Sequence, residues 1–303
     1  MVILITGVAG YIGSATATRF LEAGHKVIGI DNLSGKNKKA IKNIKKYYEI
    51  DFYEVDISNG NALEDVVSRF KIDMVFHFAA STNENFSKKD NLTFYENNII
   101  NLFKVLKVMK KHKINNLIYP SSIFAKIGLE NTNDAYVKTK ILAENMIRDY
   151  ANTNPDFSYA ILRYCNIAGY YSKIFLGEFE HYSIIKNVAR LACGKAELGR
   201  DFIYDENYHF VHIDDVVNIN LKIANELHEK RQNICTTIAS KESISVKELV
   251  ALVEKLSKKD INITIALKNE HKHEEKFCNY LEYELEYSIE DICKNQLEHE
   301  ARF

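Results

Sequence analysis

The first residues, 1–31, constrain the fold of this chain more than any other stretch. Residues 2–6 (VILIT) form a continuous apolar, β-branched run, which is typical of a strand buried on both faces of a parallel sheet. Gly7, Gly10 and Gly13 follow at once, where a tight turn, a close approach of ligand to backbone and close packing of helix on strand each require a missing side chain. An amphipathic run at residues 11–23 predicts the helix that begins at this turn.

The start of that helix predicts an anion site, because its free backbone amides and positive dipole end favour a group such as pyrophosphate. Residues 26–31 (KVIGID) predict a second buried strand, and Asp31 at its end can accept hydrogen bonds from an adenosine ribose. The same carboxylate would repel a ribose 2′-phosphate, which favours NAD over NADP. Strand, glycine turn, helix, strand and acid occur in the required order, so this context predicts dinucleotide binding where glycines alone would not.

Composition narrows the class of protein. The 303 residues, 46% of them hydrophobic, can bury a full core, and 40 Lys and Arg against 41 Asp and Glu give no reason to expect nucleic acid or an anionic membrane as partner. Met1 leads straight into a strand, and no apolar run is long enough to span a bilayer, so a cytoplasmic protein is expected. Five scattered cysteines without C-x-x-C spacing predict neither a disulfide framework nor a metal site.

The pattern of strands and helices continues downstream. Strands are predicted at 51–55, 74–80 and 115–119, and helices at 62–70 and 97–112. This alternation predicts an α/β fold with a Rossmann-type doubly wound parallel sheet, whose ligand edge lies at the carboxyl ends of the strands. Asp56 and Ser122 follow such ends, and the small residues Ala79 and Ala80 end the strand at 74–80. Pro120 is expected to break the strand before it, and His77 is interpreted as a core histidine rather than a catalytic base.

Tyr136 and Lys140 lie four residues apart at the start of a helix predicted to reach Tyr150, so both side chains project from one face. A phenol with an ordinary pKa of about 10 is a poor base near pH 7, but an adjacent ammonium and a positively charged nicotinamide would both favour the phenolate. Tyr136 could then take a proton from a substrate alcohol while hydride leaves the same carbon. This spacing is common by chance, but the dinucleotide motif that precedes it favours a catalytic role for the pair.

These motifs together resemble the extended short-chain dehydrogenase/reductase superfamily, and most closely its nucleotide-sugar epimerases of the UDP-glucose 4-epimerase type. The matching segments are VILITGVAGYIGS at 2–14, DNLSGK at 31–36, DI at 56–57, HFAAS at 77–81, YENN at 95–98, PSS at 120–122, YVKTK at 136–140, ILRYCNIAG at 161–169 and FVHIDDVV at 210–217.

The resemblance implies a set of site residues. Ser122, Tyr136 and Lys140 would be catalytic, and Ser122, Asn166, Ser183 and Ile184 would contact the substrate. NAD would be lined by Gly7, Gly10, Tyr11, Ile12, Gly13, Asp31, Asn32, Asp56, Ile57, Phe78, Ala79, Ala80, Asn98, Tyr136, Lys140 and Cys165. Cys165 stands where the family usually has Phe, which implies a smaller wall beside the nicotinamide. A homodimer would form through the helices at 97–112 and 136–150.

The second half of the chain departs from the family pattern. Residues 1–165 are expected to form the NAD-binding domain and residues 166–303 mainly a smaller α/β substrate domain, with some segments returning to the first. Helices are predicted at 184–193, 214–228 and 245–258, and strands at 159–164, 234–239 and 261–267. Asp214 and Asp215 open one of these helices, where capping is at least as good an explanation as chemistry.

Two arginines that clamp the nucleotide diphosphate in this family have no clear counterpart. Tyr208-His209 stand before FVHIDD, and no proline-arginine-arginine motif follows residue 267. Arg200-Asp201-Phe202 could supply one charge through a shifted loop. Lys186, Arg190, Lys195 and Arg200 are the candidates to compensate. His271 and His273 lie in a charged run that is interpreted as solvated rather than metal-binding.

The sequence therefore favours an NAD-dependent epimerase of a nucleotide sugar, working through a transient 4-keto sugar. The alternatives are a sugar dehydrogenase or reductase, and a non-catalytic NAD-binding regulatory protein with a degenerate sugar site. A dehydratase ranks low, because Ile123-Phe124-Ala125 offers no acid after the serine strand.

Overall fold

The chain forms two compact units, which are described separately. The computed structural model describes residues 1–35, 37–81, 90–126, 134–174, 176, 183–195, 203–266 and 283–302. Unit 1 comprises Met1–Tyr164, Ile174–Glu180 and Val217–Thr236, and unit 2 comprises Cys165–Lys173, His181–Val216 and Thr237–Phe303. Each unit has an apolar core of its own. Among the described helices, none combines the length and the hydropathy that a membrane span requires.

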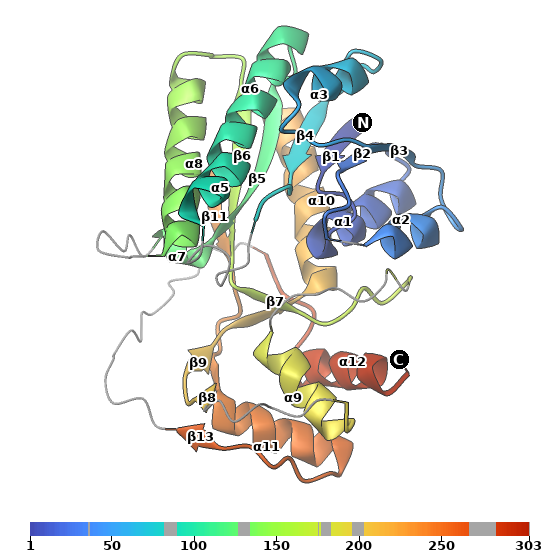
Figure 1. The fold of residues 1–303 in the computed structure, drawn as a ribbon, viewed down its shortest axis with the longest axis vertical. Coiled ribbons are helices and arrows are strands. Elements are labelled where there is room, and N and C mark those ends of the chain that lie inside the picture. Colours follow the sequence, from blue (N-terminus) through green and yellow to red (C-terminus); the bar gives the residue numbers. More distant parts are fainter. Residues whose placement is uncertain are drawn as a thin grey trace. The chain divides into compact units, whose positions relative to one another are not determined.

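A seven-stranded sheet forms the centre of unit 1 (Figure 1). In order across the sheet, the strands are β3 (Asp51–Glu54), β2 (Lys26–Asp31), β1 (Val2–Thr6), β4 (Met74–His77), β5 (Asn116–Ser122), β6 (Ser158–Tyr164) and β11 (Ile234–Ile238). Neighbours from β3 to β6 run parallel. This confirms the predicted Rossmann-type fold, and it places the reversal of strand order, where such sheets bind ligands, between β1 and β4.

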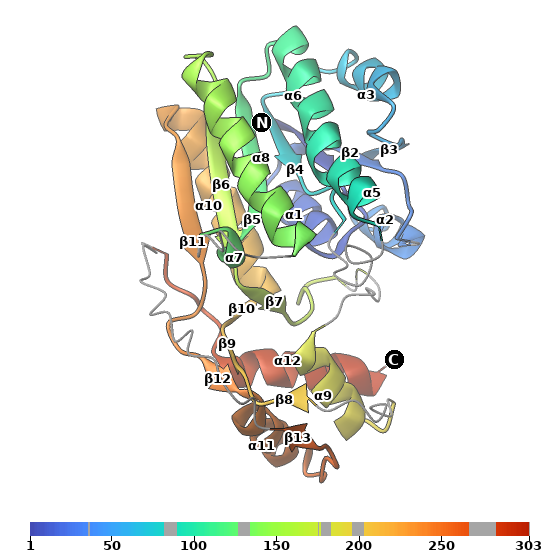
Figure 2. The same ribbon diagram turned by 60° about the vertical axis from the view of Figure 1, so that its left-hand side comes forward.

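Helices cover both faces of this sheet (Figures 1 and 2). α3 (Gly60–Val67), α6 (Asn101–His112) and α8 (Ala135–Asn152) bury their apolar sides in one core with β1, β2, β4 and β5. α1 (Tyr11–Glu22) and α10 (Ile213–Lys230) lie on the other face, where Asn220 Nδ2 donates to Thr16 Oγ1 over 3.2 Å. α2 (Lys38–Ile44) follows β2.

The helix predicted at 97–112 is longer than expected and changes its pitch. α5 (Asn91–Tyr95), the π-helical turn η1 (Glu96–Ile100) and α6 follow one another directly. The start of α5 has a cap that the sequence reading overlooked, since the side chain of Asp90 accepts from Thr93 N over 3.0 Å. Asn98, expected at the start of a helix, instead lies buried within the π turn.

Strand β5 continues through Pro120, so the predicted break there is wrong. The last residues that pair β4 with β5 are Phe76 and Ile118, so Pro120 lies beyond the part of the strand that β4 bonds. On the other side it lies opposite Leu162 of β6. Proline has no N–H to donate, and it is tolerated where one neighbouring strand has already ended. The strand therefore carries Ser121 and Ser122 as its last two residues, followed by α7 (Ile123–Lys126).

Unit 2 is organised around three helices that share one core: α9 (Ile184–Ala192), α11 (Val246–Ser257) and α12 (Ile289–Arg302). Short strand pairs accompany them: β7 (Asn166–Ala168) with β10 (Phe210–His212), β9 (Asn207–Tyr208) with β12 (Ile244–Ser245), and β8 (Ile203–Tyr204) with β13 (Ile265–Ala266).

The predicted α9 and α11 are confirmed, and a capping box between Ser245 and Glu248 begins α11. α12 was not predicted, because charges mask its two buried apolar residues, Ile292 and Cys293. Of the strand predicted at 261–267, β13 alone forms, and residue 267 lies outside the described residues.

Asp214 and Asp215 hold the chain segment that leads into α12. Asp215 accepts backbone N–H groups of Glu286 at 2.9 Å and Tyr287 at 3.3 Å. Asp214 accepts the Tyr287 hydroxyl at 3.1 Å. Both acids lie in the first turn of α10, as predicted, and these hydrogen bonds also make them links between distant parts of unit 2.

The steric reason for glycine in the β1–α1 turn is clear at two positions. Gly7 has a φ of +72°, and a Cβ there would lie 2.6 Å from Ala79 N. A Cβ on Gly13 would lie 2.2 Å from the Gly7 carbonyl oxygen. That oxygen also accepts the Gly10 N–H at 3.0 Å, so three glycines surround one backbone carbonyl. The turn is thus closed against side chains at Gly7 and Gly13, as the sequence pattern predicts.

We expect Gly13→Ala to lower the free energy of unfolding by about 1–3 kcal/mol, because the new methyl group would meet backbone atoms that cannot rotate away. The matched control is Gly60→Ala in the first turn of α3, where a Cβ meets nothing within 4 Å. It should be neutral or stabilising by up to about 1 kcal/mol. Urea titration monitored by circular dichroism measures both, and equal stabilities for the two variants would contradict the expectation.

Candidate active site

Acceptor groups gather at the ends of β2 and β3, beside the glycine turn. Asp31 Oδ2 accepts Ala9 N at 2.9 Å and Oδ1 accepts Leu33 N at 2.8 Å, so the carboxylate is fixed between the turn and its own strand end. Desolvation raises the pKa of the Asp31 carboxyl group, and the two hydrogen bonds act in the opposite direction and lower it. Asn32 Nδ2 donates to Asp56 Oδ2 at 2.9 Å. The structure therefore brings Asp31, Asn32 and Asp56 to one edge, with Ile57 buried behind them.

The end of β4 is held by an asparagine in the π turn. Asn98 Oδ1 accepts Ser81 N at 2.7 Å, and Asn98 Nδ2 donates to Ser81 O at 3.0 Å and to Thr139 Oγ1 at 3.1 Å. Phe78, Ala79 and Ala80 directly precede Ser81, which Asn98 holds, and they are half-buried. Asn98 thus links the β4 end to α8, and its contact with NAD stays a prediction. His77 is a core histidine as predicted, with Nδ1 2.8 Å from Thr6 Oγ1 and a pKa lowered to about 3 by burial.

Tyr136 and Lys140 lie on one side of α8, whose N-cap, Asp134, accepts the Tyr136 N–H at 2.8 Å. Lys140 is buried, and its Nζ donates to the carbonyl oxygen of Pro120 at 2.7 Å. The ammonium lies 4.9 Å from the centre of the Tyr119 ring and 5.8 Å from that of Tyr136. Burial lowers the pKa of Lys140 to about 8, although the charge of Glu144 acts in the opposite direction.

Ser122 ends the strand to which Lys140 is bonded. Its side chain is buried, and its Oγ accepts the Phe124 N–H at 3.3 Å in the first turn of α7. No acid occupies residues 123–126 of α7, where a dehydratase would need one. The bond from Lys140 to Pro120 therefore couples the helix that carries Tyr136 to the strand end that carries Ser122.

Four of the remaining predicted site residues belong to unit 2. Cys165 N donates to Ile238 O at 3.0 Å, and burial raises the pKa of its thiol to about 12. Asn166 begins β7, is exposed and donates through Nδ2 to His209 O at 3.2 Å. Ser183 and Ile184 form the N-cap and first residue of α9, and Ile184 is buried. Tyr11 and Ile12, in unit 1, are half-buried at the start of α1.

Three of the four candidate replacements for the missing arginine clamp, Lys186, Arg190 and Lys195, have interactions within unit 2. Lys195 Nζ donates to the carbonyl of Glu300, and Arg190 Nη2 donates to Lys195 O at 3.4 Å. Lys186 is buried in α9, and its charge adds to the burial that lowers the pKa of His299 to about 4. The candidates Arg200, Asp201 and Phe202, the loop lysine Lys36, and His271 and His273 lie outside the described residues.

Sequence reasoning missed Glu144 and Arg163, which form the most extensive charged contact beside Lys140. Glu144 is 2% exposed and accepts two hydrogen bonds from Arg163, at 2.8 and 2.6 Å. A signal was present, because Glu144 follows Lys140 by four residues and so shares the face of α8 that Tyr136 occupies.

The described geometry fits a bound dinucleotide. The glycine turn is closed against side chains, α1 begins directly after it, and the Asp31 carboxylate, which can accept hydrogen bonds from a ribose, lies at the end of the next strand. Together with a buried lysine beside a tyrosine, this defines an NAD-dependent Rossmann-fold enzyme. Residues 3–235 match the NAD dependent epimerase/dehydratase family, and the chain belongs to that family.

The chain is also similar to individual proteins that are named as epimerases. The chain is 30% identical over 283 residues to UDP-glucose 4-epimerase of Dictyostelium discoideum, which covers 86% of this chain and 82% of the relative. The UDP-Glc/GlcNAc 4-epimerase of Campylobacter jejuni is 28% identical, with a TM-score of 0.79 over 100% of this chain and 99% of that one. A UDP-glucose 4-epimerase of Bifidobacterium longum, solved with NAD+ and UDP, shares the fold at a TM-score of 0.82 and 22% identity, over 100% and 98% of the two chains.

We expect Asp31→Asn to reduce the preference for NAD over NADP by about tenfold or more, because it removes the charge that would repel a 2′-phosphate. The ratio of the two dissociation constants, measured by calorimetry, reports this. The control is Asp51→Asn at the opposite end of the neighbouring strand, where the carboxylate is exposed and pairs with Lys26 at 3.0 Å. An unchanged ratio in the Asp31 variant would show that this carboxylate does not face the ribose.

Proposed function

We propose that this protein is a nucleotide-sugar 4-epimerase that acts on a UDP-hexose and passes through a transient 4-keto sugar. The observation that carries the proposal is the contact of Lys140, Pro120 and Tyr136 beside Ser122 in an NAD-type Rossmann unit. The relatives named above support the substrate class, and the missing acid in α7 argues against dehydration.

NAD, when bound, supplies a reversible acceptor for a hydride. Gly7, Gly10, Tyr11, Ile12, Gly13, Asp31, Asn32, Asp56, Ile57, Phe78, Ala79, Ala80, Asn98 and Cys165 are the proposed residues that hold it. In the proposed mechanism, Tyr136 removes the proton of the sugar 4-hydroxyl and returns it after the ketone has presented its other face. Ser122 donates a hydrogen bond that orients the reacting oxygen, and the positive charge of Lys140 favours the phenolate form of Tyr136.

We propose Asn166, Ser183 and Ile184 as contacts of the substrate, with the diphosphate held by cations other than the two arginines usual in the family. Two charge-assisted hydrogen bonds contribute about 1.5–3 kcal/mol each, so the missing clamp must be replaced for tight binding.

The direct test is incubation of the purified protein with UDP-glucose, UDP-galactose and their N-acetyl forms, followed by NMR that distinguishes the 4-epimers. Interconversion at a constant total of nucleotide sugar supports epimerisation. Stoichiometric formation of reduced cofactor would instead show a dehydrogenase, and no reaction with any of the four would overturn the proposal.

For Tyr136→Phe we expect kcat to fall by about 10²–10⁴-fold, because the variant retains the ring and loses the proton acceptor. NAD binding should change by less than about threefold. Tyr150→Phe, on the same helix, is the control: its ring packs edge-on against Phe157 at 4.7 Å and Phe preserves this contact. Steady-state rates of both variants decide the matter, and a wild-type kcat for Tyr136→Phe would exclude Tyr136 as the base.

We also propose that the protein is a cytoplasmic homodimer, paired through α6 and α8. Large apolar side chains are exposed on these helices and on the turns before α6: Leu92 (84%), Ile100 (47%), Phe103 (49%) and Leu142 (46%). α6 and α8 lie side by side on one face of the sheet in both views (Figures 1 and 2), so a second copy would cover the exposed apolar side chains of both helices.

The double variant Phe103→Glu, Leu142→Glu should therefore convert a dimer into a monomer, because four buried like charges would face one another across a two-fold axis. Light scattering after gel filtration measures the mass. Tyr47→Glu, at a side chain that is 67% exposed near the end of α2, should leave it unchanged. A wild-type protein of single-chain mass would contradict the proposal at once.

A further inference from the structure

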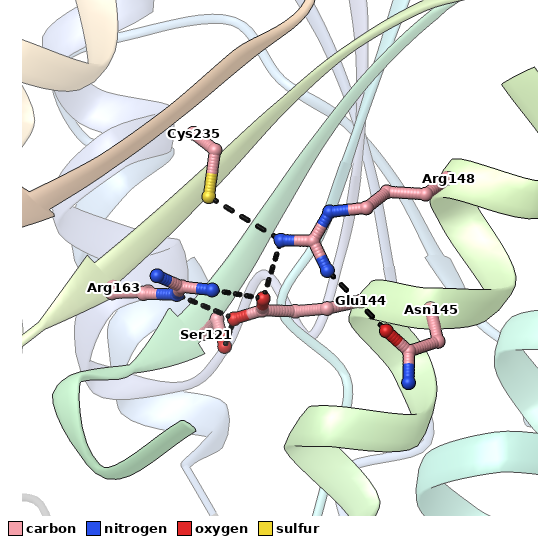
Figure 3. Close-up of polar contacts among 6 residues, drawn as sticks. All are labelled: Ser121, Glu144, Asn145, Arg148, Arg163 and Cys235. Carbon is pink, nitrogen blue, oxygen red and sulfur yellow. Dashed lines mark hydrogen bonds and ion pairs between the residues drawn. The ribbon is translucent and has the colours of Figure 1, made fainter. Parts of the chain in front are cut away.

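Glu144 is the meeting point of three elements of unit 1 (Figure 3). It projects from α8 and accepts the Ser121 hydroxyl of β5 at 2.6 Å and the guanidinium of Arg163 of β6 through both carboxylate oxygens. Arg148, one turn further along α8, donates to Glu144 Oε2 at 2.8 Å. A carboxylate that is 2% exposed is costly to bury, and four hydrogen bonds from three partners offset that cost.

These bonds fix the register of α8 against the end of β5. Lys140 bonds the carbonyl of Pro120, and Glu144, one helical turn later, bonds the side chain of Ser121. Successive turns of the helix are thereby tied to successive residues of the strand. Tyr136 lies one turn before Lys140, and Ser122 is the next strand residue, so the same two ties determine how Tyr136 and Ser122 are placed.

We propose that Glu144 is a positioning residue of the epimerase reaction, which acts through Lys140 and Ser121 to hold Tyr136 against Ser122. This inference rests on the proposed function. Glu144 itself need touch neither sugar nor cofactor. Its partner Arg163 lies opposite Ser121 in the β5–β6 pairing, so the ion pair also locks the two strand ends together.

The charge of Glu144 matters for Lys140 as well. The titratable groups around Lys140 are Tyr119 on β5, His77 on β4, Tyr136 and Glu144 on α8, and, bound to Glu144, Arg148 and Arg163. Burial raises the pKa of Tyr119 and lowers that of His77 to about 3, so both are neutral near pH 7. The charge of Glu144 opposes the desolvation that lowers the Lys140 pKa to about 8.

Removal of the Glu144 charge should lower the pKa of Lys140. Lys140 is protonated below its pKa of about 8 and loses its charge as the pH rises through that value. Glu144→Gln keeps the size of the side chain and removes the anion, while both arginines stay charged. The pKa of Lys140 should fall, and the alkaline limb of kcat should move to lower pH.

The test uses Glu144→Gln in the protein as purified, with two readouts. The titration of the Lys140 ammonium is followed by NMR of ¹³Cε-labelled lysine, assigned with Lys140→Arg, and its midpoint should lie below that of the wild type. Against UDP-galactose, kcat at pH 8 should fall by about tenfold or more while KM changes by less than about threefold. Glu226→Gln, which breaks a 2.7 Å ion pair with Lys230 on α10, is the control and should move neither.

A merely structural role would lower the melting temperature and leave the Lys140 titration where it is, and that outcome would overturn the proposal. Should Glu144→Gln fail to fold, Glu144→Asp carries the test. It keeps the charge but is too short to reach Ser121 and Arg163 together, so a wild-type kcat in that variant would overturn the proposal too. The Lys140 titration needs no substrate, so it remains decisive even if no nucleotide sugar is turned over.

Discussion

The structure of unit 1 depends on placing one ammonium group where water cannot reach it. Lys140 is 3% exposed, and a lone charge so deep in a protein would lose its proton or unfold its surroundings. Three features keep it tolerable: the Pro120 carbonyl, the face of the Tyr119 ring and the nearby Glu144 carboxylate. Each of the three depends on a different property of the fold. Strand β5 has to include Pro120, the Tyr119 ring has to lie in the core, and Arg148 and Arg163 have to neutralise the charge of Glu144.

Much of unit 1 could be predicted from sequence because its signals are local. Continuous apolar runs identify β1, β2 and β6, and the helical period identifies α1 and α8. The same local logic produced the error at Pro120, since whether a strand can include proline depends on where its neighbour ends, and the sequence of β5 does not contain that information. Asn98 was expected to be a cofactor contact at a helix start, yet its hydrogen bonds to Ser81 and Thr139 join segments far apart along the chain.

Unit 2 was less predictable for a different physical reason. Its strands are short, and its helix α12 buries only a few apolar side chains among many charges. The alternation typical of a strand and the apolar period typical of a helix are therefore both weak in this part of the sequence. Asp215 accepts the backbone N–H groups of residues 286 and 287, and Asp214 accepts the Tyr287 hydroxyl, which are long-range contacts that no local pattern indicates. Glu144 was the reverse case: its position one turn after Lys140 was visible, but its importance depends on Arg163 and Ser121, which only the paired strands bring beside it.

The π turn at Glu96–Ile100 has a consequence for how this chain tolerates change in length. A π turn holds one residue more than the α-helical turn it replaces, so η1 behaves as an insertion absorbed inside a helix. Deleting a single residue there would restore a regular helix from α5 to α6 without opening a loop, and it would change the direction of the side chains within the turn while α5 and α6 keep their orientation. The two asparagines that now reach Ser81, Asn97 and Asn98, would then point elsewhere. The helix is therefore a place where one residue more or less alters the end of β4 while the core stays intact.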